Sequence, residues 1–343
     1  MDIQNHFYGH SAALALAAGL RRPRHIPGLL QHGWTAVSPA GVHTHNFPQV
    51  GVDERWTLFV WSHSSRAWSP EGEPRATTAI GSPFLYLARE AAAAGWKPTE
   101  LGRSVWIPFH GTRLMRVRGD HVALAREAAD HEGPCTVCLH VEDASDPQIV
   151  AAWTAAGHEL VTAGRRNDPD FLARILAVIG PARRVASNRL STAVMYAAAL
   201  GKQVAVYGPP LTLGGDEART VDQIRDTWPE LHGRSTDVEL TMPLAAVELG
   251  GDALLPAAEL RAALGWDHAL RMRPAGYYWL ASSVRKAGTV LGVAARSDTT
   301  GLDESTLSPW AFLKHPLSHL PAPLPRRVPC VPELAAPVPV RSV

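Results

Sequence analysis

Histidines stand at the ends of several short apolar runs that are typical of β-strands. His32, His63 and His110 each occupy such a position, and Gly33 directly after His32 leaves that ring accessible. Histidine titrates close to neutral pH, so it suits a general base that removes a proton from an attacking group. A hydrogen-bonded structural histidine is the alternative at each position. The sequence therefore predicts His32, His63 and His110 as candidate catalytic residues, with His32 foremost.

A second group of polar residues lies in the segment RVASNRLSTAVMYAAALGKQVAVYG, residues 184–208. Its pattern predicts a strand that ends at Ser187 and Asn188. A helix is expected to begin near Ser191 and Thr192. Backbone N–H groups and hydroxyls at a helix N-terminus bind phosphate. Capping needs only one hydroxyl, whereas this turn offers four polar side chains, so the segment predicts a phosphate site.

These residues need a scaffold, which the chain provides as alternating strands and helices. In the first half the expected strands are 25–34, 56–62, 77–81 and 104–110, and the expected helices are 11–20, 82–95 and 120–133. In the second half the expected strands are 135–141, 159–164, 183–188 and 203–208, and the expected helices are 146–157, 168–180, 191–201, 220–231, 257–266 and 276–288. Such alternation indicates βαβ units and parallel sheets, whose ligands bind beyond the carboxyl ends of the strands.

We therefore expect an α/β protein with two Rossmann-like βαβ domains that face a cleft. The expected boundary lies in HEGPC, so that residues 1–132 form the first domain and residues 133–300 the second. Residues 301–343 are rich in proline, which predicts an extended C-terminal segment.

The composition argues against several classes of function. The chain has 343 residues, with 33 lysines and arginines against 32 aspartates and glutamates, and thus a formal net charge of +1. This balance gives no long-range field for nucleic acid or an anionic membrane. The N-terminus lacks the basic region of a signal peptide, and no apolar run approaches the ~20 residues of a membrane-spanning helix. We expect a cytoplasmic protein with no membrane span and no nucleic-acid partner.

The chain resembles GT-B glycosyltransferases, in particular bacterial capsule, sialyl- and polyol-phosphate transferases. The features that carry the resemblance are two βα-rich halves, the HG pair at His32 and Gly33, and the pattern SNxxSTAxxYAxxLGKxVxVYG over residues 187–208. The likeness in layout covers residues 5–210.

The resemblance implies that the second domain binds a nucleotide-sugar donor and the first a small-molecule acceptor. The implied donor-binding residues are Ser187, Asn188, Ser191 and Thr192 around the phosphates, Gly164, Arg165 and Asn167 around the base and ribose, and Tyr207 after the next strand. His32 would be the base that acts on the acceptor. The resemblance also implies that no metal or cofactor is needed besides the donor, and that the C-terminal segment packs back on the first domain.

Two other functions remain as alternatives. His43 and His45, together with His32, Asp53 and His63, would be the ligands of a metal-dependent hydrolase. The second alternative is a non-catalytic protein that binds a nucleotide or a sugar on the same fold. The sequence predicts no oligomeric state.

Two further motifs are expected to be structural. Asp168-Pro169-Asp170 has the letters of a metal-binding DxD motif, but Asp followed by Pro before an apolar run is typical of a helix start. Cys135 and Cys138 have the spacing of a redox or zinc pair. They lie within an expected strand, so we expect two small buried side chains.

Overall fold

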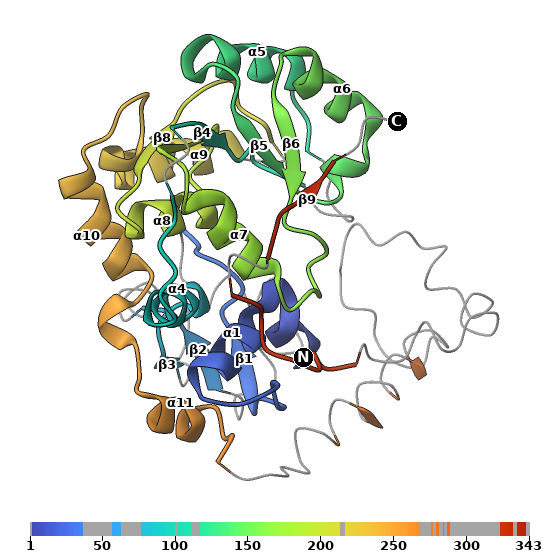
Figure 1. Ribbon diagram of the computed structural model, residues 1–343, viewed down its shortest axis with the longest axis vertical. Coiled ribbons are helices and arrows are strands. Elements are labelled where there is room, and N and C mark those ends of the chain that lie inside the picture. Colours follow the sequence, from blue (N-terminus) through green and yellow to red (C-terminus); the bar gives the residue numbers. More distant parts are fainter. Residues whose placement is uncertain are drawn as a thin grey trace.

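The computed structural model describes residues 2–36, 57–62, 77–99, 102–111, 117–212, 217–267, 323–331 and 335–340, together with residues 276, 279–280, 284 and 287–288. Two β-sheets form the frame of these residues (Figure 1). The first sheet contains β1 (Gly28–Leu30), β2 (Thr57–Val60) and β3 (Thr77–Ala79) in that order, all parallel.

The second sheet has the strand order β8-β7-β4-β5-β6-β9 within the described residues. Its strands are β4 (Ser104–Trp106), β5 (Thr136–Leu139), β6 (Glu159–Thr162), β7 (Arg184–Ser187), β8 (Gln203–Val206) and β9 (Val338–Pro339). Strands β4 to β8 are parallel, and β9 pairs antiparallel with β6 at the edge. The expected α/β fold with two Rossmann-like parts is confirmed.

Several of the helices begin at a residue whose side chain caps the first turn. The helices are η1 (Asp2–Gly9), α1 (His10–Ala17), α4 (Pro83–Ala93), α5 (His121–Glu132), η3 (Asp143–Ser145), α6 (Pro147–Ala155), α7 (Phe171–Ile179), α8 (Thr192–Ala199), α9 (Glu217–Thr227), η4 (Pro229–Leu231), α10 (Val238–Glu248), η5 (Gly251–Ala253) and α11 (Ala257–Ala263). The side chains of Ser82, Asp120 and Asp146 accept hydrogen bonds from the first turns of α4, α5 and α6. A cap oxygen satisfies a backbone N–H that has no partner within the helix.

The strand order of the second sheet contains a topological switch point. The chain runs outward from β4 through β5 to β6, and then outward on the other side from β7 to β8. The connections after β4 and β7 therefore leave on opposite faces of the sheet, which opens a crevice beyond the carboxyl ends of these two strands. Open α/β sheets bind ligands at this position.

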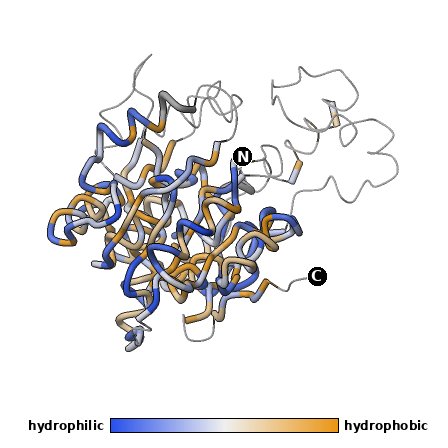
Figure 2. Tube along the Cα trace, turned by 90° about the horizontal axis from the view of Figure 1, so that it is seen from above, coloured by the Kyte–Doolittle hydropathy of each residue, from blue (hydrophilic) through white to orange (hydrophobic). Residues whose placement is uncertain are grey.

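The two sheets share one hydrophobic cluster, so their relative placement is set by packing. Trp61 at the end of β2 belongs to the same cluster as Val105 of β4 and Val185 of β7. Between the sheets, Phe84 of α4 stacks on Tyr196 of α8 with ring centroids 4.0 Å apart. Figure 2 shows hydrophobic stretches running through the middle of the molecule.

The division between the sheets differs from the expected one. The strand expected over 104–110 was assigned to the first domain, but β4 pairs with β5 and β7 at the centre of the second sheet. The chain thus enters the second sheet at residue 104, and the boundary expected at residues 132 and 133 does not follow the sheets. Alternation of strands and helices does not reveal which sheet a strand joins, because the local pattern is the same in both.

The chain also returns to the first sheet. The second domain expected over residues 133–300 did not include this return. Helix α10 packs on α8, and α11 contributes Leu260 to a hydrophobic cluster with Leu14 of α1. Between α10 and α11, Gly250 has φ = 70°, and a Cβ there would lie 1.8 Å from the carbonyl oxygen of Trp61. Only glycine allows this close approach of the returning chain to β2.

The C-terminal segment contacts both sheets rather than the first alone. Val328 packs against the hydrophobic cluster of α1 and α11. Arg327 pairs with Asp170 at the start of α7, and the Cys330 N–H donates to the same carboxylate over 2.9 Å. The segment then ends as β9 beside β6 (Figure 1). Its proline-rich composition suits an edge strand, because proline cannot donate a backbone hydrogen bond.

None of the helices in the described part of the chain has the length and apolar character that crossing a bilayer requires.

Candidate functional site

The loops that leave β4 and β7 meet at the switch point. The Asn188 side chain accepts a hydrogen bond from the Phe109 N–H over 2.8 Å and donates to the carbonyl oxygen of Pro209 over 3.2 Å. The Arg189 guanidinium lies 4.2 Å from the centroid of the Phe109 ring. Asn188 thus joins the loops after β4, β7 and β8. One N–H of the Asn188 amide is not used in these bonds, and the phosphate contact expected of Asn188 stays a prediction.

Histidines from three strand ends gather beside this point. His110 follows β4 and His140 follows β5, and their rings stack in parallel with centroids 4.4 Å apart. His32 follows β1 in the other sheet, and the charges of Arg166 and His110 act on its pKa. The structure thus brings together His32 and His110, as expected, and adds His140 and Arg166. His63 lies outside the described residues.

Hydrogen bonds assign different tautomers to the stacked pair. The His110 Nδ1 lies 2.8 Å from the Gly111 carbonyl oxygen. A carbonyl can only accept, so this nitrogen carries the proton and Nε2 keeps its lone pair. The His140 Nδ1 accepts from the Glu142 N–H over 3.4 Å, which places the His140 proton on Nε2. This buried Nε2–H has no acceptor among the described residues. The pair therefore offers one acceptor and one donor.

The electrostatics of the cluster favour an anion. Burial, Arg166 and His110 together lower the pKa of His32 to about 4. Burial, His110 and Arg166 together lower the pKa of His140 to about 3, and burial also lowers the pKa of His110. At neutral pH the three imidazoles are therefore uncharged beside one permanent cation, Arg166. Within the described part of the chain, the groups whose charges lower the pKa of His32 and His140 are the basic residues Arg166 and His110. An anion bound here would be stabilised and would raise these pKa values.

The first sheet closes the cluster with aromatic residues. The ring of Tyr8 lies 4.9 Å from that of His32, and the ring of His10 lies 6.5 Å from it. His10 is buried, with 2% of its surface exposed, and its own ring lies 5.8 Å from Trp61. The N-terminal segment and β2 thus shield His32 from water on this side.

The N-terminus of α8 points into the same region. The Thr192 Oγ1 accepts from the Trp34 N–H over 3.1 Å, which joins α8 to the loop that carries His32. Ser191 occupies the N-cap position without capping the helix, and its buried Oγ has no hydrogen-bond partner among the described residues. Ser187 is buried, and its Oγ accepts from the Arg189 N–H. The hydroxyls of Ser187 and Thr192 accept these bonds and keep their O–H donors, whereas the Ser191 Oγ makes no hydrogen bond within the described residues.

The loop after β6 contributes a different residue from those expected. Arg165, Arg166 and Asn167 are all exposed, and the N–H of Gly164 is bonded to Thr162 Oγ1 over 3.1 Å. The contact with the base and ribose that was expected of Gly164, Arg165 and Asn167 stays a prediction. Arg166 lies between Arg165 and Asn167, and its charge acts on His32 and His140. Loop residues follow no period, so the sequence gives no signal for which of these exposed neighbours has a charge that acts on the histidines.

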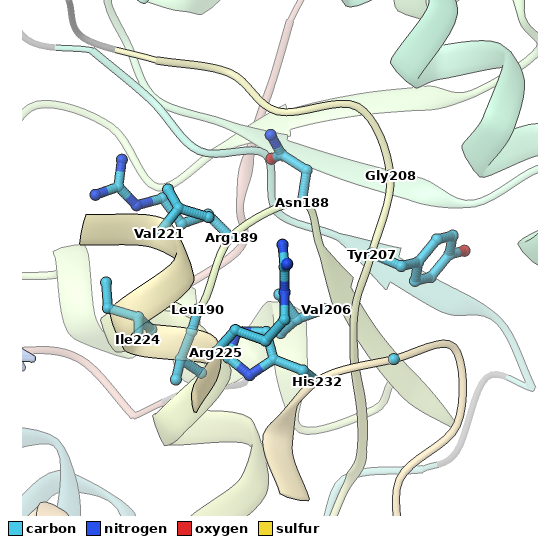
Figure 3. Close-up of a pocket in the computed structure, with 11 residues that line it drawn as sticks. Asn188, Arg189, Leu190, Val206, Tyr207, Gly208, Val221, Ile224, Arg225 and His232 are labelled. Carbon is cyan, nitrogen blue, oxygen red and sulfur yellow. The ribbon is translucent and has the colours of Figure 1, made fainter. Parts of the chain in front are cut away.

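Tyr207 was expected to bind the donor, but its side chain serves the scaffold. Its hydroxyl donates to Glu132 Oε1 over 2.8 Å. Glu132 also accepts from Ser104 and pairs with Arg184. Figure 3 shows the Tyr207 ring turned away from the neighbouring pocket. Strand alternation explains the direction, because Tyr207 follows a strand whose neighbouring side chains point to opposite faces.

A cavity of about 310 Å³ lies beyond β7 and β8, beside the switch point. Its lining includes Leu190, Val206 and Ile224, with Arg225 and His232 pointing into it (Figure 3). The His232 Nδ1 lies 2.7 Å from the Trp228 carbonyl oxygen, so it donates this bond and Nε2 remains an acceptor. The cavity thus combines apolar walls with a donor and an acceptor.

The Asp168-Pro169-Asp170 motif and the pair of Cys135 and Cys138 have structural roles, as expected. Cys138 lies in the cluster between the sheets, whereas Cys135 lies in the cluster on the other face, and burial raises the pKa of both thiols to about 12. Asp168 and Asp170 pair with Arg174, and Asp170 also holds Arg327. No group of metal-binding side chains occurs among the described residues. His43 and His45 lie outside them.

The burial of His10 is expected to make the protein less stable in acid. Burial, with a smaller contribution from His32, lowers the pKa of His10 to about 3, against ~6.5 in an unfolded chain. Between these two values the unfolded chain binds a proton that the folded protein does not, so the free energy of unfolding falls as the pH falls from about 6.5 towards 3. His10→Gln removes the group that binds this proton. The slope of the free energy of unfolding against pH should therefore become shallower by up to ~1.4 kcal/mol per pH unit. Urea unfolding at pH 7, 6, 5 and 4 measures both slopes, and parallel slopes would contradict the prediction.

No family model matches the chain, and no curated protein matches it. Among solved structures, the chain is similar to the wall teichoic acid polymerase TagF at 10% identity, with 70% of this chain and 67% of that chain covered and a TM-score of 0.33. It is also similar to Phytolacca americana UGT2 complexed with UDP-2fluoro-glucose and pterostilbene, at 10% identity, with 75% of this chain and 63% of that chain covered and a TM-score of 0.28. The function proposed below rests on the geometry of the site.

Proposed function

We propose that the protein is a glycosyltransferase that moves a sugar from a nucleotide-sugar donor to a small-molecule acceptor. The observation that carries the proposal is the cluster of His32, His110, His140 and Arg166 between the two sheets, at the switch point of the second. The basic groups that act on His32 and His140 in the described part of the chain suit the phosphates of a nucleotide. A neutral imidazole from the opposite sheet suits the proton transfer of a group-transfer reaction.

In this proposal the second sheet binds the donor. Arg166, the His140 Nε2–H and the N-terminus of α8 at Ser191 would contact the phosphates. The nucleoside would occupy the cavity of Arg225 and His232 rather than the loop of Gly164, Arg165 and Asn167, because the cavity has both the volume and the hydrogen-bonding groups. Purine and pyrimidine bases both fit these groups.

The transfer step assigns His32 as the base. The acceptor would lie on the side of the first sheet, and its hydroxyl would lose a proton to His32 as the acceptor oxygen forms a bond to the anomeric carbon. The bond between the anomeric carbon and the phosphate oxygen breaks in the same step. The electron pair leaves with the nucleotide, whose added negative charge is stabilised by Arg166 and the His140 Nε2–H. Bound phosphate would also raise the pKa of His32 and make it a stronger base.

The proposal includes transfer without a metal ion. Arg166 and the α8 dipole supply positive charge where the leaving group gains its negative charge. The nucleotide therefore has partners for its charge in the chain itself.

A thermal-shift screen tests the proposal. The ligands are UDP, GDP, CDP, CMP, dTDP and ADP, each with and without EDTA. A nucleotide at ~100 times its dissociation constant should add ~2.7 kcal/mol to the free energy of unfolding. Stabilisation by one nucleotide that is unaffected by EDTA is the expected result. No shift with any nucleotide, together with destabilisation by EDTA alone, would contradict the proposal and favour a metal-dependent enzyme.

A non-catalytic binding protein would give the same shift, so a product assay follows. The protein is incubated with sugar donors of the stabilising nucleotide and a mixture of small acceptors. Mass spectrometry should then detect an acceptor heavier by one sugar residue, together with free nucleotide. Release of nucleotide that never exceeds the enzyme concentration would show binding without turnover.

A further inference from the structure

The N-terminal segment has an unusual backbone next to the histidine cluster. Phe7 is extended, with φ = −67° and ψ = 152°, whereas Tyr8 has φ = 54° and ψ = 22°. Among the described residues, Tyr8 is the one non-glycine residue with a positive φ. Side chains with a Cβ rarely adopt this left-handed conformation, and such strain persists only where the surrounding structure enforces it.

The loop after β6 enforces this conformation. The Tyr8 N–H donates to the Arg166 carbonyl oxygen. Gly9 follows with φ = 73°, and a Cβ at this position would lie 2.8 Å from the Pro169 carbonyl oxygen. The segment thus turns sharply against the second sheet before α1 begins in the first. This turn inserts Tyr8 between the two sheets.

The inserted ring covers His32. Its centroid lies 4.9 Å from that of His32 and 4.9 Å from that of Phe171, both in edge-on geometry. The titratable and charged groups that face His32 from the surrounding elements are Tyr8 and His10 of the first part of the chain, and His110 and Arg166 of the second sheet.

We propose that Tyr8 is a positioning residue of the transfer reaction, whose strained backbone holds its ring against His32 so that the imidazole stays oriented and shielded from water. This inference rests on the proposed function, in which His32 is the base. The strain is then explained, because a relaxed backbone at this position would carry the ring away from His32. Tyr8 acts through His32 and does not itself exchange a proton.

Shielding has a measurable consequence for His32. Burial is the largest cause of its lowered pKa, ahead of Arg166 and His110. Removing the Tyr8 ring would admit water and raise the pKa of His32 towards its ordinary value. Removing only the hydroxyl would leave the ring, and thus the shielding, in place.

The matched variants are therefore Tyr8→Gly and Tyr8→Phe. In Tyr8→Gly, NMR titration of the labelled histidines should show the pKa of His32 raised by about one unit or more, because the group gains hydration. The acid limb of kcat/KM should move to higher pH by the same amount, and kcat should fall about tenfold with KM little changed. Tyr8→Phe should match the wild type in every measurement. The melting temperature of Tyr8→Gly should fall, because the loss of the ring contacts with His32 and Phe171 outweighs the relief of backbone strain.

An unchanged His32 pKa in a folded Tyr8→Gly protein would overturn the inference, as would Tyr8→Phe behaving like Tyr8→Gly. If Tyr8→Gly does not fold, Tyr8→Asn serves instead, because asparagine tolerates the left-handed region. The NMR titration needs no turnover. A raised His32 pKa without any transferase activity would therefore contradict the proposed function while supporting the contact.

Discussion

Substitution of His32 by asparagine is expected to lower kcat by about 10²–10⁴-fold, the usual contribution of a general base. The asparagine side chain is polar and similar in length to that of histidine, but it cannot accept a proton at neutral pH. The nucleotide affinity should stay within about threefold, because the groups proposed to bind the phosphates belong to the second sheet, whereas His32 follows β1 in the first. Steady-state kinetics and nucleotide titration measure the two effects separately.

The control for this prediction is His131→Asn. His131 is an exposed histidine on α5, and its replacement should leave kcat and affinity unchanged. A His32→Asn protein with the wild-type melting temperature and kcat within threefold of the wild type would show that His32 is not the base. His110 would then be the next candidate, because its Nε2 also retains a lone pair.

Substitution of Arg166 by alanine should weaken nucleotide binding by about 10- to 150-fold, the equivalent of the 1.5–3 kcal/mol typical of hydrogen bonds to charged groups. Arg166 is the permanent cation that acts on His32 and His140, and its guanidinium lies 4.4 Å from the centroid of the Phe7 ring. The loop should remain in place, because the Tyr8 N–H donates to the backbone carbonyl oxygen of residue 166, which alanine retains. Isothermal titration with the nucleotide that stabilises the protein measures the effect.

Arg165→Ala is the matched control, since it removes the same charge one residue away from an exposed position. Its nucleotide affinity should differ from that of the wild type by less than about twofold. Equal losses in the two variants would indicate a general effect of charge, and the site would then not be at Arg166. A larger loss in Arg165→Ala would restore the role that the sequence predicts for Arg165.

Elements with clear capping and turn residues could be predicted from the sequence. Asp146 and Pro147 open α6, and Ser82 and Pro83 open α4, as expected, because such pairs satisfy the first backbone groups of a helix and fix its first turn. Helix α10 was not expected. Pro243 lies inside it, and an internal proline normally argues against a helix.

The candidate site could be predicted only in part. Strand ends indicated His32 and His110, since residues after parallel strands gather at one edge of a sheet. The sequence could not show that His110 and His32 come from different sheets, because sheet membership depends on distant packing. His140 and Arg166 were missed for a related reason, which is that their roles depend on the direction of individual loop side chains.

For the polar segment after β7, the sequence predicted the elements but not the contacts of their side chains. The pattern correctly predicted a strand, a turn and a helix. The side chain of Asn188, however, joins neighbouring loops, and that of Thr192 holds the loop of Trp34. Small polar side chains satisfy backbone groups as readily as they bind phosphate, and only the contacts distinguish the two roles.

The central claim is that Arg166 and His140 of the cluster between the sheets bind the phosphates of a nucleotide next to His32. Its most direct test is a ¹⁵N NMR spectrum of the histidine side chains, recorded while the stabilising nucleotide is added to the wild type and to Arg166→Ala. We predict that the signals of His32, His110 and His140 shift on binding and that their pKa values rise, because the bound anion favours the protonated ring. Shifts confined to other histidines, or identical titrations for the two proteins, would contradict the claim.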